Sequence, residues 1–138
     1  MDIVAIERDL TAFLAGKLQK NVDADIFRSQ IPTGRNGLGI MIEKEMTYKA
    51  VSAKTYAVQI FGKYPDRDTA MCTMSLLTGL FPVSGILLGS GKILSWGLRG
   101  DGAVWKEADD GKVKYCLSVN TLVVLLTSGT QVHTTPQP

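Results

Sequence analysis

The segment IPTGRNGLGI, residues 31–40, combines three glycines with an arginine, and backbone N–H groups in loops of this kind can cradle a phosphate. Phosphate loops lead from a strand into the N-terminus of a helix, because the helix dipole favours the anion. The residues that follow here, IMIEKEM, have the pattern of a strand, and the glycines do not have the dinucleotide-binding spacing. We therefore predict a hairpin loop, with Arg35 at its tip exposed to a partner or a DNA backbone.

The segment FGKYPDRDTA, residues 61–70, does lead from a predicted strand into a predicted helix. Its acidic residues, Asp66 and Asp68, would neutralise the positive field that an anion needs at a helix N-terminus. Aspartate is also a preferred N-cap residue, because its carboxylate accepts hydrogen bonds from the first backbone N–H groups. We therefore predict a capped helix start at one of these aspartates and no anion site.

Catalytic groups and metal ligands are sparse. His133 is the one histidine, and it lies in the proline-containing segment 127–138, which has no Asp, Glu, Lys or Arg and which we expect to be disordered. A catalytic triad or a metal site needs groups held on rigid elements. Two acidic pairs are interpreted as a solvated strand face and a turn: Glu43 with Glu45, and Asp109 with Asp110. We therefore expect no enzyme activity, no metal and no cofactor.

Length and charge narrow the class of protein. The chain has 138 residues, of which 45% are hydrophobic, with 15 basic and 13 acidic side chains. This length suits one domain, which we place at residues 1–126, and the near balance of charge gives no field that would recruit nucleic acid or anionic lipid. Cys72 and Cys116 lie in apolar segments, so we expect two reduced, packed thiols.

Hydrophobic periodicity predicts the first half of the fold. Apolar residues at helical spacing predict an amphipathic helix over residues 3–20, with Asp2 as its N-cap. Residues 23–31 and 38–46 are extended, apolar segments on either side of the glycine loop, and together they predict a hairpin. Residues 55–62, TYAVQIFG, alternate in character along the chain, which predicts a half-buried strand.

The second half is predicted to be a helix followed by strands. A strand is expected over KILSWGL, residues 92–98, and the closing hairpin joins AVWKEA to VKYCLSVNTLVVLL through a turn at Asp110 and Gly111. Trp105 and Tyr115 are expected to form a cross-strand pair in this hairpin. The order of elements predicts an α+β fold, in which two helices pack on one face of a mostly antiparallel or mixed sheet.

The segment of residues 69–91 has no charged side chain, and its 23 residues are enough to span a bilayer. Pro82 lies near its middle, and glycines and hydroxyl residues dilute its apolar content. Four of its residues recur at helical spacing on one face: Ala70, Met74, Leu77 and Phe81. We therefore favour a helix followed by a buried loop over a membrane span.

Apolar side chains exceed what two helices on one sheet face can cover. The strands that must contribute to a second face contain Ile40, Ile42, Ile93, Leu94, Trp96 and Leu98. Further copies of the chain would bury that face, so we predict a homo-oligomer.

These segments, taken in order, resemble the small tail terminator or minor capsid proteins of long-tailed bacteriophages and prophages. In that family a strand reading like VQI precedes a short turn, an acidic-basic pair and a helix with spaced alanines, and the chain ends in an aromatic hairpin with a glycine turn. The matching residues are Val58, Gln59, Ile60, Asp66, Arg67 and Ala70, then Asp110, Gly111, Tyr115 and Val119. The resemblance covers about residues 3–126.

The resemblance implies a virion structural protein of the tail end or neck, assembled in the host cytoplasm. It implies a hexameric ring that caps the tail tube, ends its polymerisation and provides the head-joining surface. The implied partners are other copies of the chain, the tail tube protein and head-tail connector proteins, with DNA only passing through the lumen and no membrane contact. A neck or head-tail adaptor protein, and a membrane-associated phage accessory protein, stay open as alternatives. The ring or partner interface is expected to include Arg35, Ile40, Ile42, Trp96 and Leu98.

Overall fold

The computed structural model describes residues 3–46, 53–89 and 91–126. Along the chain its elements are α1 (Ile3–Leu18), β1 (Ile26–Arg28), β2 (Gly37–Met46), β3 (Lys54–Tyr64), α2 (Arg67–Leu80), β4 (Ile86–Leu88), β5 (Gly91–Leu98), β6 (Ala103–Asp109) and β7 (Lys112–Leu126). They form one mixed sheet with two helices packed on it, which confirms the predicted α+β fold class. The predicted cap at Asp2 and the predicted disorder of 127–138 lie outside the described residues.

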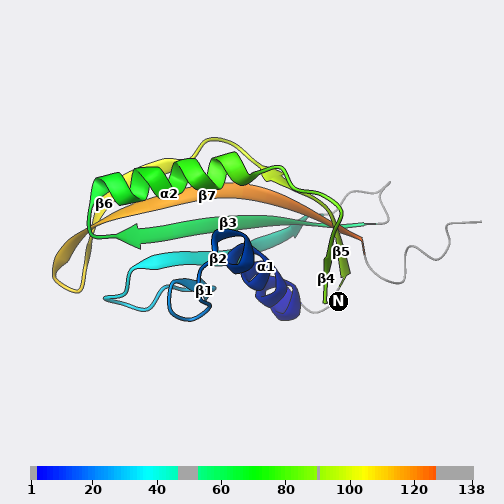
Figure 1. The fold of residues 1–138 in the computed structure, drawn as a ribbon, viewed down its shortest axis with the longest axis horizontal. Helices are drawn as coiled ribbons and strands as arrows, with labels where there is room; N and C mark the ends of the chain where they lie inside the picture. The colour runs from blue at the N-terminus through cyan, green and yellow to red at the C-terminus, as the bar shows by residue number, and fades with distance from the viewer. Residues whose placement is uncertain (1–2, 47–52, 90, 127–138) are drawn as a thin grey trace, which may run out of the picture.

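The strands lie in the order β1-β2-β3-β7-β5-β4, and β6 also pairs with β7. β1 and β2 are parallel, whereas the other pairs are antiparallel. β7 organises the sheet: it pairs with β3 along one edge, while its other edge pairs first with β6 and then with β5. In Figure 1 this strand, in orange, runs most of the length of the molecule.

Both helices pack on the same face of the sheet, at different places (Figure 1). α1 contacts β1, β2 and β4, whereas α2 contacts β3, β6 and β7. Alternate residues of β3 point toward the helices, so that Tyr56, Val58 and Ile60 join Leu10 of α1 and Leu77 of α2 in one core. We call this side of the sheet the covered face.

Trp96 of β5 lies in this core and is 0% exposed. Its ring packs against Phe13 of α1 and against Phe81, with ring centroids 5.9 and 5.1 Å away. Its indole Nε1 donates a hydrogen bond to Thr121 Oγ1 at 2.8 Å, and that hydroxyl donates to the carbonyl of Val58 at 2.8 Å. The hydroxyl partner offsets the cost of removing the indole N–H from water.

Glu7 ties α1 to the sheet from the buried side of the helix, where it is 7% exposed. Its Oε1 accepts a hydrogen bond from Arg28 Nη1 at 2.8 Å, and its Oε2 accepts one from the backbone N–H of Ile42 at 2.8 Å. The register between β2 and β3 shifts at Ile42, so the carboxylate provides a partner for a backbone donor where the strand ladder is irregular.

The hairpin predicted around the glycine loop is wrong, because β1 and β2 are parallel. β1 has only three residues, and Ser29, which follows it, turns the chain with a φ of 76°. The loop then returns so that β2 starts beside Asp25, whose carbonyl accepts a hydrogen bond from the N–H of Leu38 at 2.9 Å. Periodicity reports which residues are extended, but it carries no information on strand direction, which the loop sets.

The closing hairpin is confirmed, but one pairing in it is wrong. Asp110 and Gly111 have φ values of 54° and 75° and form a two-residue turn between Asp109 and Lys112. This turn fixes the register, and it places Trp105 opposite Cys116 rather than opposite Tyr115. A shift of one residue reverses the face of a side chain, so Trp105 and Tyr115 lie on opposite faces of the sheet.

β5 confirms the strand predicted over 92–98, and β5 and β6 together act as one interrupted strand beside β7. The interruption covers residues 99–102, where the N–H of Arg99 donates to the carbonyl of Asn120 at 2.8 Å and Gly100 has a φ of 88°. β4 was not predicted, because a three-residue strand between glycines is too short to show a period.

α2 starts as predicted, with Asp66 as its N-cap accepting a hydrogen bond from the N–H of Thr69 at 2.9 Å. Both cysteines are free, and Cys116 is buried as expected. The expectation of a packed thiol is wrong for Cys72, which is exposed on α2. Within the described part of the chain, neither helix combines the length and the apolar content needed to cross a membrane.

Candidate functional site on the open face of the sheet

We call the sheet face turned away from the helices the open face. Gln59, Phe61 and Lys63 of β3 point toward it, since they alternate with the core residues Val58 and Ile60. In the described residues, α1 and α2 contact the covered face of the sheet. Neither of these helices covers the open face.

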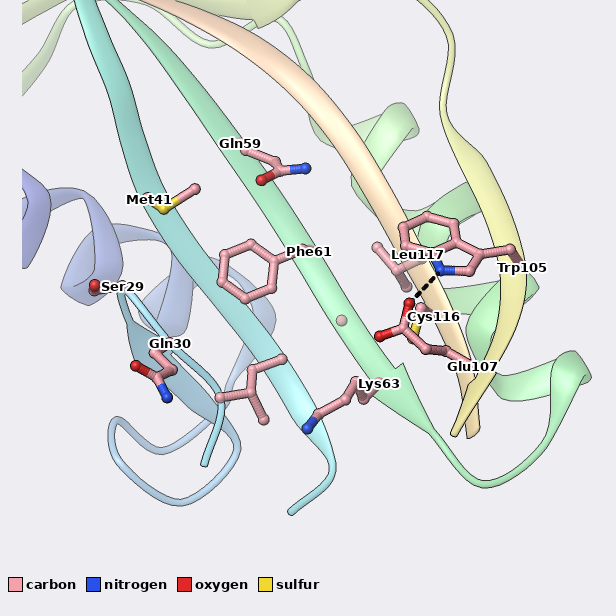
Figure 2. Close-up of a pocket in the computed structure, with 12 residues that line it drawn as sticks. Ser29, Gln30, Met41, Gln59, Phe61, Lys63, Trp105, Glu107, Cys116 and Leu117 are labelled. Carbon is pink, nitrogen blue, oxygen red and sulfur yellow. Dashed lines mark hydrogen bonds between the residues drawn. The ribbon is translucent and has the colours of Figure 1, made fainter. Parts of the chain in front are cut away.

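A hollow of about 320 Å³ lies on the open face, across β2, β3, β7 and β6. Figure 2 shows Phe61 from β3 and Trp105 from β6 on two sides of it, with Met41 of β2 and Cys116 of β7 nearby. The loop after β1 closes a further side through Ser29, Gln30 and Ile31. The lining is therefore apolar at the centre, with amide and charged groups around it.

Small residues next to large ones create this shape. A Cβ at Gly39 would lie 2.5 Å from the ring of Phe61, so the ring occupies the space over β2 that a side chain at position 39 would fill. Between Phe61 and Trp105, β7 contributes only Cys116 and Ser118 to the open face. Two large rings separated by short side chains leave a depression between them.

Several polar side chains around the hollow are paired within the chain. Gln59 Nε2 donates to Ser118 Oγ at 2.9 Å, and the indole Nε1 of Trp105 donates to Glu107 Oε1 at 3.1 Å (Figure 2). Burial raises the pKa of the Cys116 thiol, so this cysteine is not an activated thiolate. The arrangement favours binding of an apolar group more than chemistry on a ligand.

An ionic latch closes the end of the open face near the β6–β7 turn. Asp109 pairs with Lys63 at 3.1 Å and accepts a hydrogen bond from the backbone N–H of Gly34 at 3.0 Å. The ammonium group of Lys114 donates to the side-chain carbonyl of Asn36 in the same loop. The glycine loop is thus fastened to the closing hairpin, and a carboxylate of the chain occupies its backbone donor.

The latch holds Asp109 in its charged form. The hydrogen bond from Lys63 is the main cause that lowers the pKa of Asp109, and the hydrogen bond from Gly34 adds to it. The pairing gives the glycine loop a structural role, which agrees with its interpretation as a turning segment rather than a phosphate loop.

The residues expected at an interface do not form one surface. Ile40 and Trp96 are 0% exposed and belong to the covered face, so they have no surface to offer a partner and that expectation is corrected for both. Ile42 is partly buried against the same core, whereas Leu98 is 44% exposed. The strands were identified correctly, but the face on which these side chains lie was not.

Arg35 is exposed, as expected for a loop tip, but it also has partners in its own chain. Its Nη2 donates to the carbonyl of Ala24 at 3.2 Å, and its guanidinium lies 5.5 Å from the ring centroid of Phe27. These contacts fasten the loop to the segment around β1, so Arg35 has a role in local structure.

The hollow was not predicted from the sequence, although the alternation of β3 carried a signal for it. Val58 and Ile60 identify one face, so Phe61 had to lie on the other. Counting back from the Asp110–Gly111 turn would have placed Trp105 on that same face.

A second feature of the surface is Leu87 of β4, whose side chain is 80% exposed. Other large apolar side chains with substantial exposure are Val113 at 61% and Leu76 at 57%. In the described parts of the chain, no group of three or more His, Cys, Asp or Glu side chains is arranged to hold a metal ion. Comparison with protein-family models and with curated proteins gives no match.

Proposed function

We propose that this protein is a structural component of a long-tailed phage or prophage, which forms a ring on the end of the tail tube, stops tube polymerisation and provides the head-joining surface. The proposal rests on the resemblance of residues 3–126 to tail terminator and minor capsid proteins. A ring subunit needs no catalytic group; it needs surfaces that remain available for other copies of itself and for the tube.

The observation that carries the proposal is the one-sided sheet. α1 and α2 both pack on the covered face, while the open face keeps an apolar hollow between Phe61 and Trp105. Aromatic residues and methionine are enriched in the buried centres of protein interfaces, with polar and charged groups around them. The hollow has this composition, with Met41 beside its rings and Lys63 and Glu107 at its margin.

In tail assembly, the ring would act by covering the end of the tube. A closed ring on the last tube ring would cover the surfaces that the next tube subunits require, so polymerisation would end by competition for the tube end. The formal net charge of +2 is small, which suits a ring through which DNA passes without being held.

The test is the mass of the purified protein by light scattering over a range of concentration, alone and with purified tail tubes. We expect a hexamer, or a monomer that assembles on the tubes, and electron microscopy should show it at one tube end. Tubes grown with the protein should be shorter than tubes grown without it. A monomer that neither binds tubes nor changes their length would contradict the proposal.

A further inference from the structure

Leu87 is an exposed apolar knob, which lines a hollow of about 290 Å³ beside Asp9, Ala12 and Phe13 of α1. Ile86 packs against the core and Leu88 belongs to it, so the two neighbours anchor β4 and direct Leu87 outward. The residues two positions away on either side, Gly85 and Gly89, have no side chains beyond hydrogen, and both are exposed. Nothing on its own strand therefore surrounds the leucine, and 80% of its surface remains in water.

Alternation along β4 places this knob on the same side of the sheet as the hollow on the open face. Ile86 and Leu88 pack in the core of the covered face, so Leu87, which alternates with them, points to the open face. The backbone pairing runs from Leu87 to Lys92 of β5 and from Lys92 to Leu126 of β7. Ten residues of strand separate positions 116 and 126, which is roughly 30 Å at the usual rise of a strand. Knob and hollow therefore occupy opposite ends of one face, and a single chain cannot bring them together.

We propose that the hollow on the open face receives Leu87 of a second copy of this chain. The hollow has a volume of about 320 Å³ and is lined by the rings of Phe61 and Trp105, and between these rings β7 carries only the short side chains of Cys116 and Ser118. Seating it removes the most exposed of the large apolar side chains in the described residues from water, together with part of Trp105, which is 41% exposed.

The contact gives two assemblies that differ in symmetry. Two copies related by a two-fold axis would exchange knobs and close as a dimer, whereas copies related by another rotation would each give Leu87 to the next and continue as a ring. The contact itself stands independently of the proposed phage function, but only the second arrangement is compatible with a ring.

A disulfide between two copies of the chain can test this contact directly, because Cys116 already lines the hollow and only position 87 needs a new cysteine. We would introduce Leu87→Cys in a Cys72→Ser background, which removes the exposed thiol, and oxidise the otherwise complete protein with diamide. We expect a disulfide between positions 87 and 116 of different copies, identified by mass spectrometry and absent after a further Cys116→Ser change. Val113→Cys is the matched control, since position 113 is 61% exposed but lies on the β6–β7 hairpin, and it should give no link to position 116.

A second measurement does not depend on the reactivity of Cys116. Leu87→Asp should weaken self-association about tenfold or more in light scattering, as expected for loss of a central apolar contact, while Val113→Asp should leave it unchanged. The proposal would be overturned if Leu87→Asp left self-association unchanged and the Leu87→Cys protein formed no link between positions 87 and 116. A chain that never self-associates would also overturn it.

A non-reducing gel of the oxidised Leu87→Cys protein distinguishes this proposal from the proposed ring. Linked species that continue beyond the dimer support both, whereas linked species that stop at the dimer support the knob contact and contradict the ring. A hexamer by light scattering without the link between positions 87 and 116 supports the ring and overturns the knob contact. Links only between two copies of position 87, which persist after Cys116→Ser, would also overturn it.

Discussion

The two tryptophans of this chain show how differently its two sheet faces are used. Trp96 points to the covered face, is 0% exposed, packs against the rings of Phe13 and Phe81, and has a hydroxyl partner for its indole N–H. Trp105 points to the open face, is 41% exposed, and bonds to Glu107 at the surface. The strands that carry them, β5 and β6, lie end to end beside the same partner strand. The difference comes from register and alternation and not from residue type.

This comparison separates folding from association. Side chains on the covered face are buried when one chain folds, so their loss should appear in the free energy of unfolding. The large rings on the open face, Phe61 and Trp105, remain partly in water after folding, so their loss should appear mainly when a second molecule covers them.

The largest effect is expected for Trp96→Ala. It empties the centre of the core and leaves Thr121 without its indole partner, so we expect the free energy of unfolding to fall by about 3–5 kcal/mol. Chemical denaturation of the dilute monomer measures this. Trp105→Ala is the matched change on the open face, and it should cost about 1 kcal/mol or less while weakening self-association. Equal losses of stability in the two variants would break the distinction between the faces.

The covered face was the part that the sequence could predict. Helical spacing in α1 and alternation in β3 both follow from burial against one core, so the pattern identifies Leu10, Val58 and Ile60 without knowledge of the partner strands. The N-cap at Asp66 and the turn at Asp110 are local signals, determined by the few residues around them.

The open face could not be predicted to the same extent, because it depends on the tertiary arrangement. The hollow combines Met41, Phe61, Trp105 and Cys116 from four strands, and it exists only once the strand order and register are set. The direction of β1 and the pairing of Trp105 were wrong for the same reason: each depends on how a loop returns the chain. Local periodicity does not contain that information.

The next largest effect is expected at the start of β2, where Gly37→Ala should cost about 3 kcal/mol. Gly37 has a φ of 141°, and a Cβ there would lie 2.4 Å from the carbonyl oxygen of Asp25, so the added methyl must displace β1 from β2. Thermal and chemical unfolding both report the loss. Gly16→Ala on α1 is the control, because a Cβ there meets no atom within 4 Å, and it should stabilise the protein by about 0.5–1 kcal/mol. A neutral Gly37→Ala would mean that β1 is not held beside β2.

Glu7→Gln tests the attachment of α1 to the covered face, with an expected cost of about 1–3 kcal/mol. Both carboxylate oxygens of Glu7 accept hydrogen bonds, from Arg28 and from the N–H of Ile42. A glutamine has one oxygen and one NH2 group, so one of these two N–H donors would face another donor and lose its acceptor. The measurement is the denaturation midpoint at neutral pH. Glu43→Gln, at an exposed position of β2, should change it by less than about 0.5 kcal/mol. A similar small change for both glutamates would show that Glu7 does not fasten the helix.

The smallest effect is expected for the ionic latch on the open face, and it should depend on pH. The folded chain lowers the pKa of Asp109 below its ordinary value of 3.8, chiefly through the hydrogen bond from Lys63. A carboxyl with a lowered pKa in the folded state stabilises the fold at pH values above that ordinary value, and this stabilisation is lost as the pH falls through the folded pKa. The difference in denaturation midpoint between the wild type and Asp109→Asn should therefore be present at about pH 6 and shrink on acidification. Lys63→Gln should reduce the same pH-dependent difference, because it removes the cation that Asp109 pairs with. A difference that stays constant over this range would show that the charge of Asp109 does not hold the glycine loop to the closing hairpin, and the end of the open face would then be fixed by backbone pairing alone.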